Sequence, residues 1–245
     1  MARVRAVLFD IDGTLLDSND AHAHAWLDAL RGHGINVPWD LVRRKIGMGG
    51  DKLLREVASI DHESVDGRSI AERRVALLKS HYLPDVGPFA GARVLVDRVR
   101  SRGMTCAAVT SASAADAADL LRAAAVADLM DHVVTADDAD ASKPDPDLVE
   151  IALDRLGLAP TEAMMIGDTP YDVEAAVRAG VPVIAFRSGG WKDEDLAGAI
   201  AIYDGPADMS AQLDRTPLVQ GFDENELSSM TRVRARARRS AMGGI

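Results

Sequence analysis

Residues 4–18 read VRAVLFDIDGTLLDS, and this stretch decides the fold. Its first six residues form a short apolar run, which is typical of a buried parallel strand. Asp10 and Asp12 follow at once, and Gly13 permits a sharp turn behind them. In an open α/β sheet, ligands bind at the carboxyl ends of the strands. The stretch therefore predicts a strand that places two carboxylates at the ligand-binding edge of a sheet.

Similar apolar runs recur along the chain, separated by helical patterns. The runs are Met104–Val109, His132–Thr135, Ala163–Ile166, Val181–Phe186 and the weaker Ala199–Tyr203. The helical patterns are Ala92–Arg100, Ala114–Ala124, Asp147–Leu156 and Tyr171–Ala179. Strands that alternate with helices predict an α/β fold with a Rossmann-like parallel sheet and helices on both of its faces.

Residues 17–86 interrupt this alternation, because apolar positions recur there only at helical spacing. The helical patterns of this region are Ala21–Leu30, Leu41–Ile46, Lys52–Ser59 and Ile70–Leu83. We therefore expect three parts of the chain. They are a Rossmann-like core over residues 1–16 and 87–213, a small all-helical cap over residues 17–86, and a C-terminal tail over residues 214–245.

Charge and cysteine content narrow the class of protein. The 245 residues carry a formal net charge of −10, which disfavours nucleic acid and anionic membranes as partners. Five arginines lie between residues 232 and 239. We interpret this part as a solvated tail or a frayed helix, and the alternative is a patch that binds nucleic acid or a membrane surface. The single cysteine, Cys106, excludes an intrachain disulfide and suits a reducing compartment. No apolar stretch is long enough for a signal peptide or a membrane span, so we expect a cytoplasmic protein.

Acidic residues at two strand ends indicate a metal site. Carboxylates as close as Asp10 and Asp12 raise each other's pKa unless a cation neutralises them. A hard cation such as Mg²⁺ suits oxygen ligands and binds substrate phosphate at the same time. Asp168 follows another strand and is suited to complete the site. Asp172 lies four residues on, where it would hold a metal-bound water, orient a lysine, or favour the start of a helix.

Two further motifs supply groups that suit a phosphate. Thr110 and Ser111 follow the strand at Met104–Val109, where hydroxyls and backbone N–H groups hold phosphate oxygens or cap a helix. Lys143 lies in a loop stiffened by two prolines. A positive charge fixed there would offset the Asp10 carboxylate and the phosphate.

The four motifs follow one another along the chain around Asp10, Thr110, Lys143 and Asp168. In this chain order they resemble the haloacid dehalogenase (HAD) superfamily over about residues 4–190. The likeness is strongest to the phosphoglycolate phosphatase and β-phosphoglucomutase-like branch, which carries a helical cap between the first two motifs. The resemblance implies a Mg²⁺-dependent phosphoric monoester hydrolase that acts on a small-molecule phosphate ester, with Thr110 or Ser111 holding the phosphate. The dehalogenases of the superfamily lack an acid at the place of Asp12, so we expect a phosphate substrate rather than a carbon–halogen bond.

The resemblance also implies a role for each charged motif residue. Asp10 attacks phosphorus and becomes an aspartyl-phosphate. Asp12 protonates the leaving alcohol and then activates water. Asp10, Asp168 and the backbone carbonyl of Asp12 bind Mg²⁺, and Lys143 steadies the nucleophile and the phosphate.

From the cap, His22 and Lys45 are candidate substrate contacts. His22 falls where β-phosphoglucomutases carry a histidine near the active site, although a polar helix residue facing solvent is the alternative. Lys45 belongs to a basic run that precedes the glycine-rich turn of the cap. Gly49 or Gly50 stands where these mutases carry an arginine for a second phosphate, which favours a phosphatase.

Three functions follow from these observations. A phosphatase of a small phosphorylated metabolite is the first choice. The alternatives are a β-phosphoglucomutase-like phosphomutase and a phosphate-binding regulatory protein without turnover. The motifs keep every acid and the lysine, which argues against a protein that has lost turnover. No feature of the sequence sets the oligomeric state.

Overall fold

A parallel sheet forms the centre of the core, and the computed structural model describes residues 3–222 of the chain. The strands are β1 (Ala6–Phe9), β2 (Thr105–Val109), β3 (His132–Val134), β4 (Ala163–Gly167), β5 (Val183–Phe186) and β6 (Ala201–Tyr203). Their spatial order is β3-β2-β1-β4-β5-β6, with every neighbouring pair parallel. The strand order reverses between β1 and β4, which is where doubly wound sheets bind their ligands.

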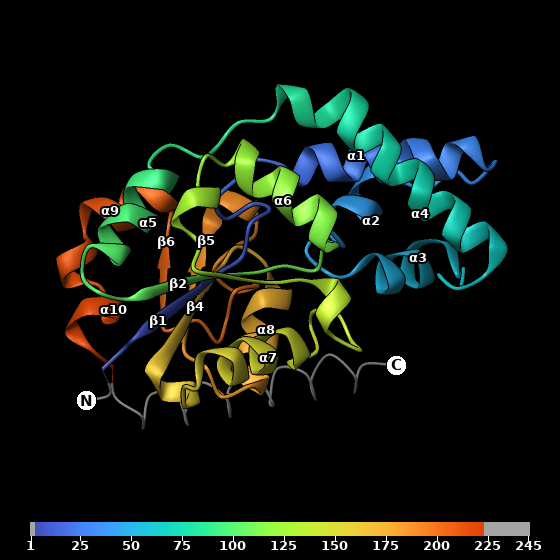
Figure 1. Ribbon diagram of the computed structural model, residues 1–245. Helices are drawn as coiled ribbons and strands as arrows, with labels where there is room; N and C mark the ends of the chain where they lie inside the picture. The colour runs from blue at the N-terminus through green and yellow to red at the C-terminus, as the bar shows by residue number, and fades with distance from the viewer. Residues whose placement is uncertain (1–2, 223–245) are drawn as a thin grey trace.

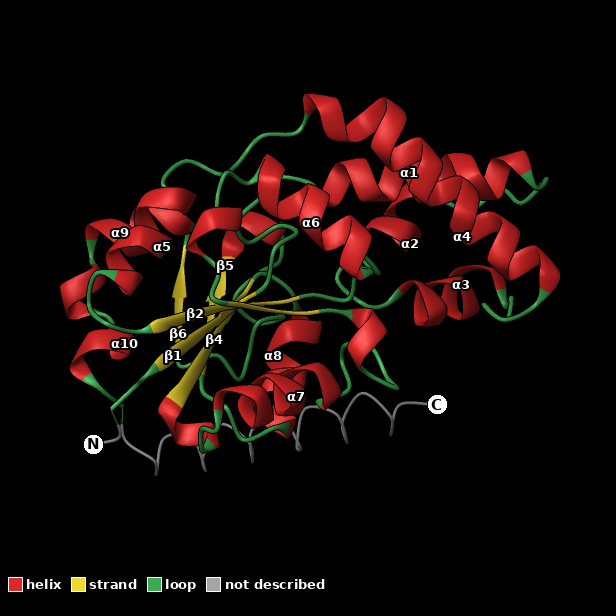
Figure 2. Ribbon diagram, in the orientation of Figure 1, coloured by secondary structure: helices red, strands yellow, loops and turns green. Residues whose placement is uncertain are grey.

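Helices cover both faces of this sheet, as the sequence predicted (Figures 1 and 2). The core helices are α5 (Ala92–Arg100), α6 (Ala114–Ala123), α7 (Asp147–Leu156), α8 (Pro170–Arg178), α9 (Pro206–Ala211) and α10 (Pro217–Gln220). Side chains of a strand alternate between the two faces. Accordingly, Val7 and Phe9 pack with α5, α6 and α9, whereas Leu8 packs with α7 and α8. The α/β fold class is therefore confirmed.

A group of helices follows β1 and lies to one side of the sheet (Figure 1). It consists of α1 (Asn19–Gly32), α2 (Trp39–Arg43), α3 (Gly50–Ala58) and α4 (Val65–Leu77), which we call the cap. The cap has its own apolar cluster, in which Trp26 and Leu30 of α1 meet Leu54 of α3 and Ile70 of α4. The Ser64 hydroxyl accepts a hydrogen bond from the Gly67 N–H, so α4 begins five residues before the apolar pattern indicates.

Two chain segments join the cap to the core and run side by side. The Asp17 N–H donates to the Gly87 carbonyl at 3.1 Å, and the Phe89 N–H donates to the Leu15 carbonyl at 3.0 Å. Between these bonds, Leu16 and Pro88 form an antiparallel bridge. The segment that carries the DxD motif is therefore tied to the segment by which the chain returns from the cap.

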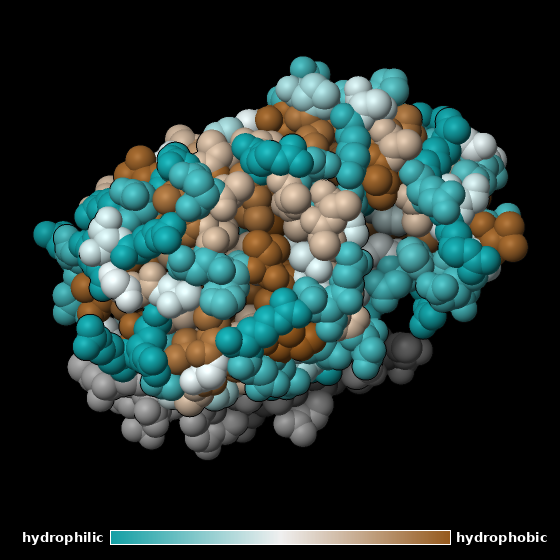
Figure 3. Space-filling model, in the orientation of Figure 1, coloured by the Kyte–Doolittle hydropathy of each residue, from teal (hydrophilic) through white to brown (hydrophobic). Residues whose placement is uncertain are grey.

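The beginning of the expected tail packs on the core. Leu218 of α10 and Phe222 are buried in the same cluster as Val7. The arginine-rich part, residues 232–239, lies outside the described residues. Among residues 3–222, no helix is long and apolar enough to cross a membrane. Hydrophilic side chains cover much of the face in Figure 3, and large apolar residues with high exposure are few.

Candidate active site

Asp10 and Lys143 form a buried ion pair at the carboxyl end of β1. The Lys143 Nζ lies 2.5 Å from Asp10 Oδ1 and 2.8 Å from Asp172 Oδ1. It also donates to the Val109 carbonyl at 2.8 Å, and the residue has no exposed surface. Burial alone would lower the pKa of Lys143, but the carboxylates of Asp10 and Asp172 outweigh it and raise that pKa. Lys143 therefore stays charged and fixes the position of Asp10.

Two opposing effects act on the pKa of Asp10. Burial raises the pKa of its carboxyl group to about 7, although the charge of Lys143 acts to lower it. The neighbouring carboxylates add to the rise. A second cation beside Asp10 would therefore restore its ionised form at neutral pH.

Asp168 and Asp172 complete an acidic cluster with Asp10. One carboxylate oxygen from each lies within 4.8 Å of the others, and all three residues are buried. Burial, together with the charges of Asp10 and Asp172, raises the pKa of Asp168 well above its ordinary value. Buried carboxylates at this spacing are typical of a divalent metal site, because oxygen ligands suit hard cations. The residues therefore fit such an ion. The sequence predicted Asp10 and Asp168 as ligands with Asp172 beside them, and the structure brings these three acids together.

Polar residues of the first motif hold Asp168 in place. The Thr14 hydroxyl donates to Asp168 Oδ1 at 3.0 Å, and the Asn19 amide donates to Oδ2 at 2.8 Å. Gly13 has a φ of +80°, and a Cβ at that residue would lie 2.0 Å from Asp168 Oδ2. Only glycine therefore fits the turn between the two aspartates and the cluster. Sequence reasoning missed Thr14 and Asn19, although their place beside the DxD motif was a usable signal.

Asp12 turns toward the cap instead of joining the acidic cluster. Its Oδ1 lies 2.8 Å from His22 Nε2 and also accepts a hydrogen bond from the Ser18 hydroxyl. Burial would raise the pKa of Asp12, but His22 and Ser18 outweigh burial and lower it. His22 is buried, so it does not face solvent on α1. The two aspartates of the motif thus lie in different surroundings, one with Lys143 and one with His22.

A cavity of about 660 Å³ lies between the cap and the carboxyl ends of the strands. Its lining residues from the core include Asp10, Asp12, Thr110 and Ser111, and those from the cap include His22, Trp26 and Arg74. The Thr110 hydroxyl already accepts a hydrogen bond from the Ala112 N–H at 3.1 Å. The Ser111 hydroxyl is buried and has no hydrogen-bond partner among residues 3–222, so it is the freer of the two for a ligand.

Lys45 does not reach this cavity. Its ammonium pairs with Glu56, and it is absent from the lining residues. Arg74 does line the cavity, yet no sequence motif marks it, because a lone arginine on a polar helix face is usually solvated. A larger hollow of about 770 Å³ lies near Arg5 and Arg102, at the opposite ends of the strands. None of its lining residues within the described part of the chain is acidic, and it lies away from the cluster.

Comparison with known proteins identifies the class. The sequence matches the haloacid dehalogenase-like hydrolase family over residues 7–186, and the chain belongs to this family. A phosphoglycolate phosphatase of Rhodospirillum rubrum is 34% identical over 213 residues, which cover 82% of this chain and 87% of that protein. An N-acetylmuramic acid 6-phosphate phosphatase of Pseudomonas aeruginosa is 28% identical over 218 residues, covering 87% and 96%.

A solved structure gives the same result. The crystal structure of a hydrolase from Pseudomonas syringae superposes with a TM-score of 0.79 at 30% identity, and the match covers 86% of this chain and 98% of that one. The resemblance inferred from the four motifs is therefore confirmed for both family and fold.

Proposed function

We propose that this protein is a Mg²⁺-dependent phosphatase that hydrolyses a small phosphorylated metabolite through an aspartyl-phosphate on Asp10. The observation that carries the proposal is the meeting of Asp10, Lys143 and Asp168 beside a cavity that lies between the core and the cap. A nucleophile, a fixed cation and a metal-binding acid are the groups that phosphoryl transfer needs. The phosphatase relatives support the same reaction class.

Asp10, Asp168 and the backbone carbonyl of Asp12 would hold the Mg²⁺ ion, with Asp172 beside them. Bound there, the ion supplies positive charge that offsets the charge on the phosphoryl oxygens. Lys143 supplies a second positive charge from the side of Asp172. The free hydroxyl of Ser111 is our choice for the phosphate contact that the sequence left open between Ser111 and Thr110.

In the first half of the reaction, the Asp10 carboxylate attacks phosphorus and the bond to the leaving oxygen breaks. Asp12 donates a proton to that oxygen, so an alcohol leaves. The ordinary state of Asp12 is ionised, since His22 and Ser18 lower its pKa. An arriving phosphate brings negative charge close to Asp12 and thereby raises the pKa, which lets Asp12 carry the proton.

In the second half, Asp12 accepts a proton from water, and the water oxygen attacks the phosphorus of the aspartyl-phosphate. The bond to Asp10 breaks, which releases inorganic phosphate and restores the carboxylate. The hydrogen bond from His22 at 2.8 Å holds Asp12 in place for both steps. We infer that the cap over residues 17–86 excludes other water during the first step. We also infer a cytoplasmic setting, which the single cysteine suits.

The test is phosphate release from a panel of phosphorylated metabolites, with Mg²⁺ and with EDTA. Asp10→Asn should lower turnover at least ~10³-fold, because it removes the nucleophile. Asp17→Asn is the matched control, since this exposed acid of the same motif makes the same chemical change away from the cluster. Near-full activity of Asp10→Asn would overturn the proposal.

The same reactions separate the alternatives. A phosphomutase would release no phosphate and would isomerise a sugar phosphate when given a bisphosphate primer. A phosphate-binding protein would give neither product. Metal-dependent release from a few related esters, lost in Asp10→Asn and kept in Asp17→Asn, would establish the phosphatase.

A further inference from the structure

Lys52 of the cap contacts the loop that carries Lys143. It lies in the first turn of α3, and its ammonium donates to the Ser142 carbonyl and to Asp145 Oδ2, the second at 2.6 Å. These two acceptors belong to the residues that flank Lys143 and Pro144 along the chain. One side chain of the cap therefore bridges the loop on either side of the catalytic lysine.

The residues next to Lys52 hold the same loop. Asp51 accepts a hydrogen bond from the Ser142 hydroxyl at 2.8 Å, and Ser142 is buried. A Cβ on Gly49 would collide with that hydroxyl, so only glycine lets the cap approach the loop this closely. The hydroxyl and the carbonyl of Ser142 are thus both bound by consecutive residues of the cap.

The core holds this loop through the other carboxylate oxygen of Asp145. Arg178 of α8 lies 2.7 Å from Asp145 Oδ1, and it also donates to the Pro144 carbonyl at 3.2 Å. One oxygen of Asp145 therefore pairs with the core and the other with Lys52 of the cap. If the cap moved away, the loop would keep its bonds to Arg178 and lose those to the cap.

The position of this loop matters because it sets the position of the Lys143 ammonium. That ammonium lies 2.5 Å from Asp10 Oδ1, and its long side chain starts from the loop backbone. A displacement of about 1 Å at a reacting centre can slow a reaction up to ~100-fold. Catalytic side chains keep such precision only where the residues that support them are themselves fixed.

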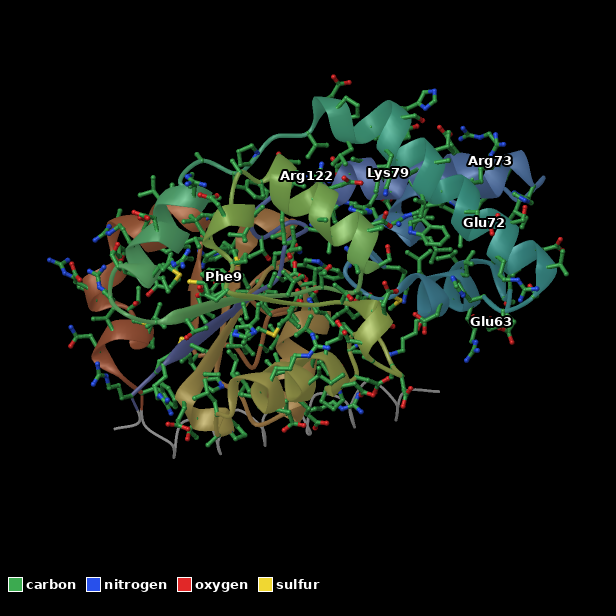
Figure 4. The ribbon with its side chains drawn as sticks, in the orientation of Figure 1. Phe9, Glu63, Glu72, Arg73, Lys79 and Arg122 are labelled. Atoms are coloured by element: carbon green, nitrogen blue, oxygen red, sulfur yellow. The ribbon has the colours of Figure 1, made fainter. Side chains whose placement is uncertain are left out.

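A second charged contact between the cap and the core lies elsewhere. Lys79 follows α4 and pairs with Asp116 at 2.9 Å and with Asp119 at 3.0 Å, and both acids lie on α6. Figure 4 shows Lys79 on the part of the cap near α6, the helix that bears Arg122. Lys79 therefore docks the cap at a different place from Lys52, and the two lysines can be compared directly.

We propose that Lys52 is a positioning residue, which places Lys143 against Asp10 when the cap lies on the core. This inference rests on the proposed phosphatase function and concerns the same site. It makes the placement of the catalytic lysine depend on a residue of the cap. The nucleophile and its cation would then be fully assembled only while the cap is docked.

Steady-state kinetics of the full chain test this inference, with Mg²⁺ present and p-nitrophenyl phosphate as the substrate. Because the leaving group of this ester needs no proton from Asp12, its cleavage reports on Asp10 and Lys143. Lys52→Met should lower kcat at least ~10-fold and raise KM by less, since a displaced cation stabilises the transition state less well. Lys52→Arg keeps a positive charge on a long side chain and should restore most of kcat.

Two control variants separate this effect from a general loss of charge. Lys45→Met removes a cation that is 26% exposed, as Lys52 is, but that pairs with Glu56 within the cap. Lys79→Met removes the contact with α6. Both should keep kcat within about twofold of the unaltered protein, because partly exposed ion pairs contribute little. An equal loss of kcat in Lys79→Met, or a change of KM alone in Lys52→Met, would overturn the inference, since Lys52 would then only dock the cap.

Hydrogen exchange separates this inference from the proposed function, because it needs no turnover. The measured quantity is the exchange rate of the backbone amides in residues 142–149 of the unliganded protein, followed by mass spectrometry. We expect it to be at least ~3-fold faster in Lys52→Met than in Lys45→Met and Lys79→Met, as the loss of hydrogen bonds to the loop predicts. That result supports the placement of the loop by Lys52 even if no ester is hydrolysed. Equal exchange in the three variants would overturn it even if the phosphatase is established.

Discussion

Replacement of Lys143 by methionine tests the electrostatic balance of the site. Methionine keeps the length of the side chain and removes its charge. The change leaves the carboxylates of Asp10 and Asp172 without the ammonium that lies 2.5 and 2.8 Å from them. Removing one member of a buried ion pair costs about 3–5 kcal/mol, because an unpaired charge stays buried. We expect Lys143→Met to lower the free energy of unfolding by that amount at pH 8 in EDTA.

The loss should depend on pH in a defined direction. The pKa of Asp10 is about 7 with Lys143 in place, and without that cation it rises further. An acid whose folded-state pKa lies above its unfolded value destabilises the fold as the pH rises between the two values. The defect of Lys143→Met should therefore shrink from pH 8 to pH 5, where the carboxyl groups take up protons. Added Mg²⁺ should also restore part of the stability at pH 8.

Urea unfolding followed by circular dichroism measures these free energies. Lys52→Met is the matched control, because its partner Asp145 lies 2.6 Å away but both side chains are partly exposed, at 26% and 31%. Such a pair contributes less than about 1 kcal/mol. If Lys143→Met cost no more than Lys52→Met at pH 8 in EDTA, the argument from buried charge would be refuted.

Three further predictions concern the metal and the phosphate. Gly13→Ala should weaken Mg²⁺ binding at least ~10-fold in a calorimetric titration. The reason is that the new Cβ would meet Asp168 Oδ2 and that alanine would be strained at a φ of +80°. In the unaltered protein, Mg²⁺ affinity should fall about tenfold per pH unit below 7, since Asp10 with a pKa of about 7 must lose its proton to bind the ion; equal affinity at pH 6 and pH 8 would contradict this. Ser111→Ala should raise the Kd for inorganic phosphate about tenfold, measured by calorimetry. Thr110→Val should change it less, because of these two hydroxyls it is that of Ser111 that lacks a partner in the described part of the chain.

The strands and the acidic residues at their carboxyl ends could be predicted, because the sequence patterns that mark them are local. A buried parallel strand is a short apolar run, and Asp10 and Asp168 each follow one directly. The predicted end of a strand was wrong by one residue where a side chain binds the backbone and terminates the strand. Thr135 was expected in β3, but its side chain and backbone N–H bond to Asp138 and start a helical turn instead. The helices α9 and α10 were missed, since each is too short for a periodic pattern.

The contacts between the cap and the site could not be predicted, because they depend on how the cap packs against the core. His22 fell on the expected helix, but its burial against Asp12 requires the cap to close over β1. Arg74 and Asp116 come from α4 and α6, and nothing in either local sequence marks them as neighbours. Lys45, which stood beside the glycine-rich turn, pairs with Glu56 within the cap. Whether any of these residues takes the role proposed for it stays a prediction.

The cap packs closely on the loops that carry Asp168 and Lys143. A Cβ on Gly47 would lie 2.6 Å from the Thr169 side chain, so the turn of the cap rests directly on the residue after Asp168. From the first turn of α3, Asp51 accepts a hydrogen bond from the hydroxyl of Ser142, the residue before Lys143, at 2.8 Å. A movement of the cap would therefore change the surroundings of the loops that carry Asp168 and Lys143.

On the other side of the cavity, α4 reaches Asp12 through Arg74 and His22. The cap therefore contacts both halves of the site, because Gly47 and Asp51 pack against the loops that bear Asp168 and Lys143, and His22 holds Asp12. A displacement of the cap would disturb the surroundings of all three residues together. We therefore expect a substrate that stabilises this position of the cap also to order the phosphate site.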